Sequence, residues 1–123
     1  MAQINPSDFR LYARFECLEE AVLQSEESGN QFHGTLLDIG LGGVQIESNQ
    51  ALPTDSKLLL VLEGKEGGPL LKVHGKAKYC NAPQGSSAYM TGFKFVPESH
   101  QERVAIAEFV HDVFQRQWEI LGS

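Results

Sequence analysis

Two arginines near the start of the chain have the residue type and the spacing to bind an anion. Arg10 and Arg14 stand four residues apart, in an R-x-x-x-R pattern. Residues at this spacing share a face in a helix and in a strand, so both guanidinium groups can reach one ligand in either structure. The guanidinium fork binds phosphate through paired hydrogen bonds, and its flat face stacks on purines. Taken alone, the pattern also fits two solvated arginines in surface ion pairs with Asp8 and Glu16.

A carboxylate followed by three glycines is the second feature that could carry chemistry. The pattern is D-x-G-x-x-G, from Asp38 to Gly43, and it lies between two predicted strands. The glycines, among them Gly40, allow tight turning and a close approach of the backbone to a ligand. Asp38, at the end of its strand, can accept two parallel hydrogen bonds, such as those from the N1–H and N2–H₂ of a guanine edge. The alternative is an Asx-type turn in a hairpin, in which the glycines supply positive φ angles.

Composition limits the kind of protein that carries these residues. The chain has 123 residues, enough for one domain, and its net charge is −6. This acidic balance argues against a general nucleic-acid binder or a binder of anionic membranes. The sequence contains no apolar run long enough to span a membrane and no visible secretory signal. Cys17 and Cys80 follow no spacing pattern, so we expect a reducing, cytoplasmic setting.

The charged residues are unevenly distributed along the chain. All six lysines lie between Lys57 and Lys94, and residues 15–56 contain eight acids but no lysine or arginine. The arginine pair therefore stands directly before an acidic stretch. If the pair binds an anion, it must do so at one defined spot and not as part of a basic face.

Periodicity predicts the elements that must position these residues. Residues 1–8 have no periodic pattern and are expected to form a mobile arm, followed by a single domain over residues 9–123. Turn residues separate segments that alternate between apolar and polar residues, as strands do, and one strongly apolar segment at 57–63. The predicted strands are 9–18, 31–38, 43–48, 57–63, 71–81 and 88–96. Short strands joined by turns favour a mainly β fold, an antiparallel barrel.

The pattern changes to that of a helix after Pro97. Apolar residues then recur in steps of three and four, as on one face of a helix, and Gly122 is a plausible stop. This main stripe comprises Val104, Ala107, Val110, Phe114, Trp118 and Leu121, and further apolar residues stand at Ile106, Phe109, Val113 and Ile120. The additional residues indicate either a wide buried face against the barrel or a face that contacts a second chain.

Motifs of common enzymes are missing from the sequence. It contains neither a G-x-S-x-G elbow nor an H-E-x-x-H pair, and the glycines at 40–43 lead into a strand, unlike a dinucleotide-binding loop. The histidines are scattered, and they do not predict a metal site. We therefore expect a protein that is not an enzyme and that uses no cofactor.

In combination, the R-x-x-x-R pattern and the later D-x-G-x-x-G pattern resemble the PilZ family of bacterial cyclic di-GMP receptors. That family carries R-x-x-x-R and, twenty-odd residues later, [D/N]-x-S-x-x-G; here Arg14 and Asp38 are 24 residues apart. The resemblance runs from Arg10 to the C-terminal helix and includes residues 89–93, which look like the family's last strand. It implies a six-stranded antiparallel β-barrel with a C-terminal α-helix.

The resemblance also implies a role for each candidate residue. Arg10 and Arg14 would clamp a phosphate and stack on guanine, and Asp38 would read the guanine edge. The backbone from Gly40 to Gly43 would line the pocket. Tyr79 stands where the family often has an aromatic residue and would pack against a base, although it also fits a tyrosine at the edge of the core.

One residue departs from the family pattern. The family's serine is replaced by Gly40, which removes one hydroxyl contact to the ligand. The loss of one such hydrogen bond costs about 1–2 kcal/mol, roughly five- to thirtyfold in affinity. Phe9 directly precedes Arg10 and adds no third cation, which favours one ligand per site.

Two functions follow from the resemblance. In the first, the chain is a receptor for cyclic di-GMP whose N-terminal arm orders on binding and relays the signal to a protein effector, since a lone 123-residue module is expected to lack an output domain. In the second, it is an adaptor that no longer binds the ligand and acts through protein contacts, for instance in pilus or flagellar assemblies. Retention of both arginines and Asp38 favours the receptor, and Gly40 favours the adaptor.

Overall fold

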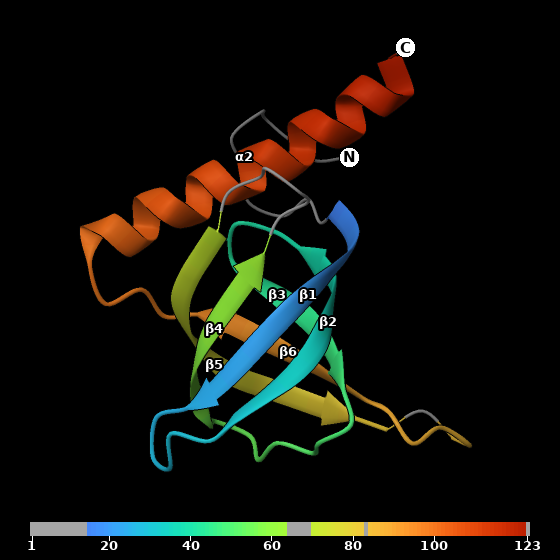
Figure 1. Cartoon of the computed structure of the whole chain (residues 1–123), viewed down its shortest axis with the longest axis vertical. Helices are drawn as coiled ribbons and strands as arrows, with labels where there is room; N and C mark the ends of the chain where they lie inside the picture. The colour runs from blue at the N-terminus through green and yellow to red at the C-terminus, as the bar shows by residue number, and fades with distance from the viewer. Residues whose placement is uncertain (1–14, 64–69, 83, 123) are drawn as a thin grey trace, which may run out of the picture.

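A closed barrel of six antiparallel strands, crossed by one helix, forms the structure (Figure 1). The computed structural model describes residues 15–63, 70–82 and 84–122. The strands pair in the order β1-β2-β3-β6-β5-β4, and β4 closes the barrel against β1. The elements are β1 (Phe15–Ser25), β2 (Gln31–Ile39), β3 (Gly43–Ser48), β4 (Lys57–Glu63), β5 (Leu70–Asn81), β6 (Tyr89–Phe95) and α2 (His100–Gly122). The predicted mainly β fold, a six-stranded antiparallel barrel with a C-terminal α-helix, is confirmed.

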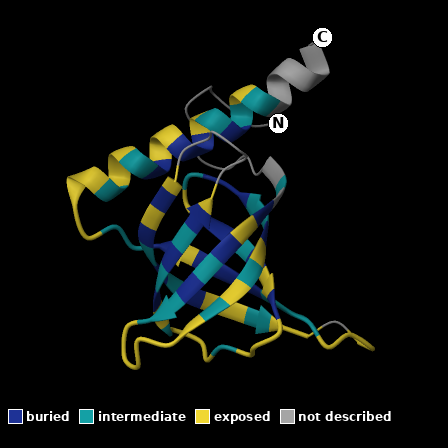
Figure 2. Cartoon of the chain, in the orientation of Figure 1, coloured by how far each residue is buried: buried dark blue, intermediate teal, exposed yellow. Residues whose placement is uncertain are grey.

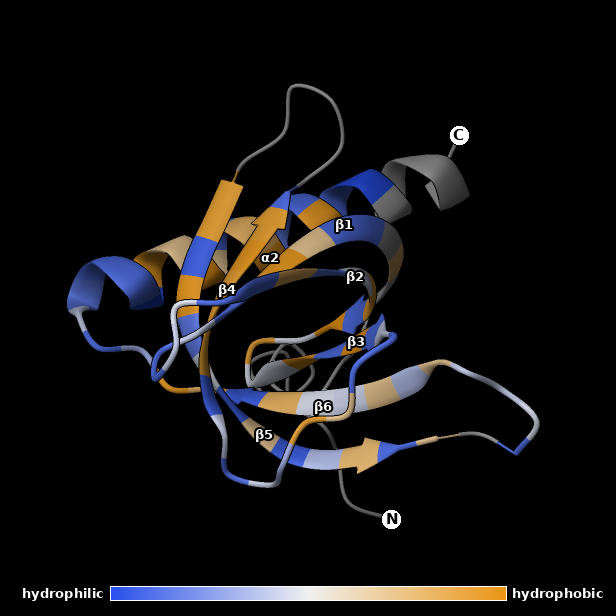
Figure 3. Cartoon of the chain, turned by 60° about the horizontal axis from the view of Figure 1, so that its bottom comes forward, coloured by the Kyte–Doolittle hydropathy of each residue, from blue (hydrophilic) through white to orange (hydrophobic). Residues whose placement is uncertain are grey.

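Alternating side chains explain why these segments form a barrel. In β4, for example, Leu58, Leu60 and Leu62 are almost completely buried, while the residues between them face outward. The same alternation in the other strands places the buried residues inside the barrel (Figure 2), and most of β4 is apolar (Figure 3). Burial of these apolar surfaces supplies the main stabilisation of the domain.

The first strand differs from its predicted range of 9–18. β1 runs from Phe15 to Ser25, so it continues well past the predicted end, and residues 9–14 lie outside the described residues. Its ladder with β2 contains an irregularity between Glu16 and Glu19. Glu19 then occupies a buried position opposite Leu36. An acid at a core-facing position hides the alternation, which is why the pattern did not predict this part of the strand.

The buried face of the helix also differs from the predicted main stripe. Figure 1 shows α2 lying across one end of the barrel, where it contacts β5 and β1. Its buried residues are Ile106, Phe109, Val110 and Val113. Of the predicted main stripe, Val104 and Ala107 are exposed while Val110 is buried, and the additional residues Ile106, Phe109 and Val113 are buried too, as expected for a wide buried face. Steps of three and four fit two neighbouring lines around a helix, and only packing against the barrel selects between them.

Polar contacts stabilise the start of the helix and hold its second half against β1. At its start, the Ser99 hydroxyl accepts a hydrogen bond from the Glu102 backbone N–H at 3.1 Å, as an N-cap does. Further along, Arg116 pairs with the buried Glu19 of β1 at 3.0 Å and with Asp112 at 3.0 Å.

Among the residues that the structure describes, no helix is both long and apolar enough to cross a membrane.

Candidate functional site

One row of paired residues crosses four strands and contains two of the predicted site residues. Asp38 of β2 pairs with Gln45 of β3, Gln45 with Gly92 of β6, and Gly92 with Tyr79 of β5. Directly paired residues in antiparallel strands point to the same face of the sheet. Here that face is the outside of the barrel, because Asp38 is half-buried and Tyr79 is 45% exposed. In the closed barrel β2 and β5 are three strands apart in either direction, so Asp38 and Tyr79 face away from each other, and Tyr79 approaches the site through the glycine turn.

The glycine turn, residues 40–43, connects β2 to β3 directly after Asp38 and Ile39. The Gly40 N–H donates a hydrogen bond to the Gly43 carbonyl oxygen at 2.9 Å, and the Gly42 carbonyl oxygen accepts one from the Phe95 N–H at 3.0 Å. Gly43 must be a glycine, because a Cβ there would overlap the Phe93 carbonyl oxygen. A Cβ on Gly42 would meet nothing within 4 Å. The turn is therefore held against β6 while its tip stays open to a ligand.

The Tyr79 side chain lies over the backbone of the neighbouring strand. A Cβ on Gly92 would overlap the Tyr79 ring, so this glycine makes room for the ring on the outer surface. A shallow cavity of about 160 Å³ opens beside the ring, and Gly43, Lys78 and Lys94 also line it. The structure thus brings Tyr79 and the glycine turn to one cavity.

Sequence reasoning missed three cations around the turn. Lys78 and Lys94 line the cavity beside Tyr79. A neighbouring cavity of about 260 Å³, bounded by Gly42 and the helix, is lined by Lys94 and Arg103. The outward positions of the two lysines in β5 and β6 could have been found from the strand alternation. Arg103 could not, because only the docking of α2 brings it to the turn.

The two predicted arginines, Arg10 and Arg14, lie outside the described residues. The described chain begins at Phe15, which pairs with Ile39, and Glu16 pairs with Asp38. The backbone of β1 therefore starts beside the C-terminal end of β2, next to Asp38.

Cys17 lies near the charged side chains of Glu19, Asp38 and Arg116. Burial raises the pKa of the Cys17 thiol to about 12, with a further increase from the Glu19 and Asp38 carboxylates that Arg116 partly offsets. At pH 8 the folded thiol therefore stays protonated, and thiolate is the reactive form. In a Cys80→Ser variant, alkylation of Cys17 by iodoacetamide should be at least 100-fold slower in the folded protein than in urea, as followed by mass spectrometry. Equal rates would contradict the raised pKa.

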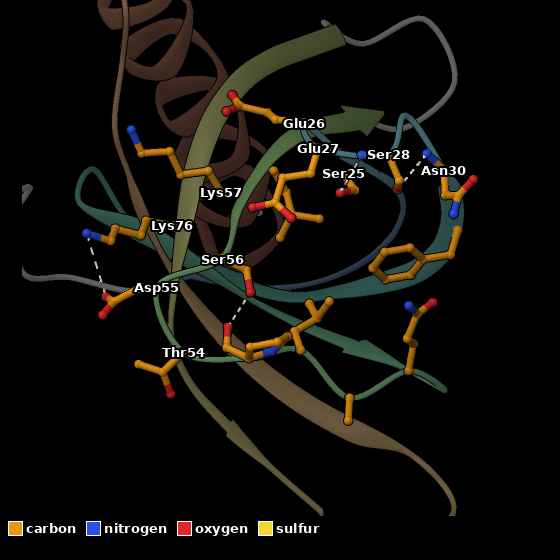
Figure 4. A pocket seen from close by; sticks show the side chains of 16 residues that line it. Ser25, Glu26, Glu27, Ser28, Asn30, Thr54, Asp55, Ser56, Lys57 and Lys76 are labelled. Atoms are coloured by element: carbon orange, nitrogen blue, oxygen red, sulfur yellow. Dashed lines mark hydrogen bonds and ion pairs between the residues drawn. The ribbon is translucent and has the colours of Figure 1, made fainter.

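A further cavity, at the other end of the barrel, contains none of the predicted site residues. It has a volume of about 610 Å³ and lies between the β1–β2 turn and the loop before β4 (Figure 4). This is the Gln31 end of β2, roughly 27 Å along the strand from the glycine turn. Its charges are mixed, with the acids Glu26, Glu27 and Asp55 beside Lys57 and Lys76. Such a lining does not define a binding site for an anion.

The fold falls in the class of six-stranded antiparallel barrels with a helix packed across one end. A family model described as PilZ domain matches residues 8–112. The chain therefore belongs to the PilZ domain family, whose members are c-di-GMP receptors and adaptors and not enzymes.

Solved structures share this fold at low sequence identity. The PilZ domain with c-di-GMP of YcgR from Escherichia coli aligns with a TM-score of 0.70 and 12% identity, over 93% of this chain and 98% of that chain. K. pneumonia MrkH in its apo state aligns with a TM-score of 0.72 and 16% identity, over 96% of this chain and 55% of that chain. The Bacillus subtilis inhibitor of motility MotI/DgrA aligns with a TM-score of 0.70 and 14% identity, over 89% and 52%.

The chain spans about half the length of MotI and MrkH. At these identities the likeness establishes the fold alone. No curated protein matches the sequence.

Proposed function

We propose that this chain is a non-catalytic receptor for cyclic di-GMP. The observation that carries the proposal is the open glycine turn, which follows Asp38 at the end of β2, shares a cavity with Tyr79 and lies beside the first residue of β1. Membership of the PilZ family and the c-di-GMP bound to the YcgR domain support the choice of ligand.

Each residue in the proposed site has a separate role. Arg14 directly precedes Phe15, which pairs with Ile39 just before the glycine turn, and we propose that the arginine pair reaches the ligand from there. Arg10 and Arg14 bind phosphate and stack on guanine, and Asp38 accepts hydrogen bonds from the guanine edge. Tyr79 packs against a base. The backbone of the turn from Gly40 to Gly43 lines the pocket.

Local charge explains how an acidic protein binds an anion. The net charge is −6, and the ligand carries two phosphodiester charges. Lys78, Lys94 and Arg103 line the cavities on both sides of the turn, on the same part of the barrel as Tyr79. These cations add to the arginine pair, so the potential that a ligand meets here differs from that of the whole molecule.

Calorimetric titration with c-di-GMP tests the proposal, with cyclic di-AMP as the matched ligand. Both ligands carry the same phosphates, but adenine lacks the paired donors that Asp38 would accept. We expect micromolar binding of one c-di-GMP per chain and at least tenfold weaker binding of cyclic di-AMP. No binding of c-di-GMP would overturn the receptor, and two ligands per chain would contradict the single-ligand site.

Restoring the family's serine should strengthen binding. Gly40 is not among the glycines with a positive φ, so its backbone conformation suits other residues. In a Gly40→Ser variant the added hydroxyl can donate a hydrogen bond to the ligand, and we expect affinity to rise roughly five- to thirtyfold. Calorimetry on the variant measures this, with Ser48→Ala, at the far end of β3, as the control. Unchanged or weaker binding by Gly40→Ser would show that this position does not contact the ligand.

We further propose that the N-terminal arm, residues 1–8, orders over the bound ligand and passes the signal to a protein effector in the cytoplasm. The arm is joined to the arginine pair, so phosphate binding by Arg10 and Arg14 restricts the residues before them. Hydrogen exchange of residues 1–14 should slow by at least tenfold when c-di-GMP is saturating. Exchange that is the same with and without ligand would rule out this relay.

The adaptor that does not bind c-di-GMP remains the second candidate because of Gly40. This residue lacks the hydroxyl of the family pattern. The exposed Val104 on α2 offers a place for protein contact. An absence of c-di-GMP binding in both the native chain and the Gly40→Ser variant would favour the adaptor.

A further inference from the structure

His74 is surrounded by carboxylates from other parts of the chain, away from the proposed nucleotide site. Its Nε2 lies 3.0 Å from an oxygen of Glu98, which precedes α2, and 3.3 Å from an oxygen of Glu26, in the turn after β1. Its Nδ1 lies 3.0 Å from Glu102, in the first turn of α2. The oxygens of Glu26 and Glu98 and the nitrogen of His74 all lie within 4.8 Å of one another. Figure 4 shows Glu26 at the edge of the large cavity.

Glu102 holds the imidazole in one orientation. One of its oxygens accepts a hydrogen bond from the His74 backbone N–H at 2.8 Å, and the other accepts one from the Glu98 backbone N–H at 3.1 Å. A carboxylate fixed in this way binds Nδ1–H, which leaves the Nε2 lone pair toward Glu26 and Glu98.

Three negatively charged carboxylates around the His74 imidazole favour a bound positive charge. Three carboxylates converge on one ring, and no lysine or arginine in the described part of the chain forms an ion pair with any of them. The Nε2 atom faces two carboxylate oxygens, at 3.0 and 3.3 Å, while Nδ1 faces Glu102. Such an arrangement is repulsive unless Nε2 carries a proton or a metal ion lies between these atoms, and a metal ion satisfies both carboxylates at once.

We propose that Glu26, His74 and Glu98 bind a divalent transition-metal ion, for which Zn²⁺ is the best match. Ligand bonds of about 2.0–2.1 Å in a tetrahedral zinc site give ligand-to-ligand distances of about 3.4 Å. The two distances from His74 are close to this value. One imidazole and two carboxylates leave the fourth position to water. Glu102 is a positioning residue, which fixes the ring through Nδ1 as the outer partners of zinc-bound histidines do.

The ion would join three segments that are distant in the sequence. Glu26 belongs to the β1–β2 turn, His74 to β5, and Glu98 to the connection between β6 and α2. A metal bond across them would tie the start of the helix to the barrel, opposite the end that Arg116 fixes on β1. Because the unfolded chain does not hold these ligands together, metal binding would stabilise the folded domain.

Zinc titration of the full chain tests this site. The protein is stripped with EDTA, freed of the chelator and titrated with ZnCl₂ in calorimetry, and Co²⁺ absorption reports a tetrahedral site. We expect one ion per chain with micromolar affinity and a higher melting temperature when Zn²⁺ is bound. His74→Ala should weaken binding at least 100-fold, and Glu98→Gln at least tenfold. The matched controls, His100→Ala and Glu27→Gln, remove exposed neighbours of the same types and should bind Zn²⁺ as the native chain does.

Each other result would overturn the site. If the native chain binds no Zn²⁺ at 100-fold excess, the cluster is an ion-pair network without a metal and the proposal fails. If His74→Ala binds as tightly as the native chain, the ion is held elsewhere. Near-ultraviolet circular dichroism establishes that the variants fold, and Glu98→Gln retains the shape of the native side chain. The outcome is independent of the nucleotide site, since Arg14→Ala should leave zinc binding unchanged.

Discussion

Replacing Arg14 with alanine is expected to weaken c-di-GMP binding at least 100-fold, which corresponds to about 2.7 kcal/mol. In the proposed site, Arg14 binds a phosphate through charge-assisted hydrogen bonds. Removing one partner of such a contact costs about 2–5 kcal/mol, since the remaining charge loses its partner. Arg10→Ala should have an effect of similar size, because both guanidinium groups are proposed to act on the same ligand. Calorimetric titration of each variant measures the loss.

Lys57→Ala is the matched control for the arginine variants. It also removes one positive charge, but Lys57 lines the large cavity at the other end of the barrel. We expect its affinity for c-di-GMP to stay within twofold of the native value, because charges beyond about 10 Å are screened at ordinary salt. If Lys57→Ala lowers affinity as much as Arg14→Ala does, binding depends on overall charge and not on a defined arginine pair.

Replacing Phe109 with alanine is expected to destabilise the domain by about 3–5 kcal/mol. Phe109 is 1% exposed and is the largest of the completely buried side chains among the described residues. It projects from α2 into the cluster that includes Ile106 and Val113, so the substitution leaves a cavity between helix and barrel. A domain of this kind is stable by only about 5–15 kcal/mol, and the loss is therefore a large share of the total.

Urea unfolding followed by circular dichroism measures this loss. Val104→Ala is the control, since Val104 is 41% exposed on the same helix and should change stability by less than about 0.5 kcal/mol. An equal effect of the two variants would mean that α2 packs through its predicted stripe and not through the face that carries Phe109.

Strands with a regular pattern of apolar residues were predicted correctly, whereas β1, which has a charged residue in the core, was not. The ranges of β3 and β4 agree with the prediction at both ends, because the alternation in β3 and the apolar run in β4 both stop at turn residues. β1 was predicted poorly because Glu19 occupies a core position, where Arg116 of a distant helix neutralises it. Local pattern cannot anticipate a partner that stands almost a hundred residues away.

The helix illustrates a related limit. Its existence follows from apolar steps of three and four, but two neighbouring lines of side chains fit those steps. Packing against β5 and β1 buried the line with Phe109 and left Val104 in solvent. The choice depended on the shape of the barrel surface, which no local window of sequence contains.

The sequence by itself determined the residue types of the candidate site: the arginine pair, Asp38 and the glycines follow one another closely enough to be recognised as a pattern. Only the tertiary structure decided that Tyr79 lies in the same row as Asp38, that Lys94 and Arg103 flank the turn, and that His74 meets three carboxylates. The physical reason is that strand pairing and helix docking join residues tens of positions apart, whereas sequence patterns report only on neighbours along the chain.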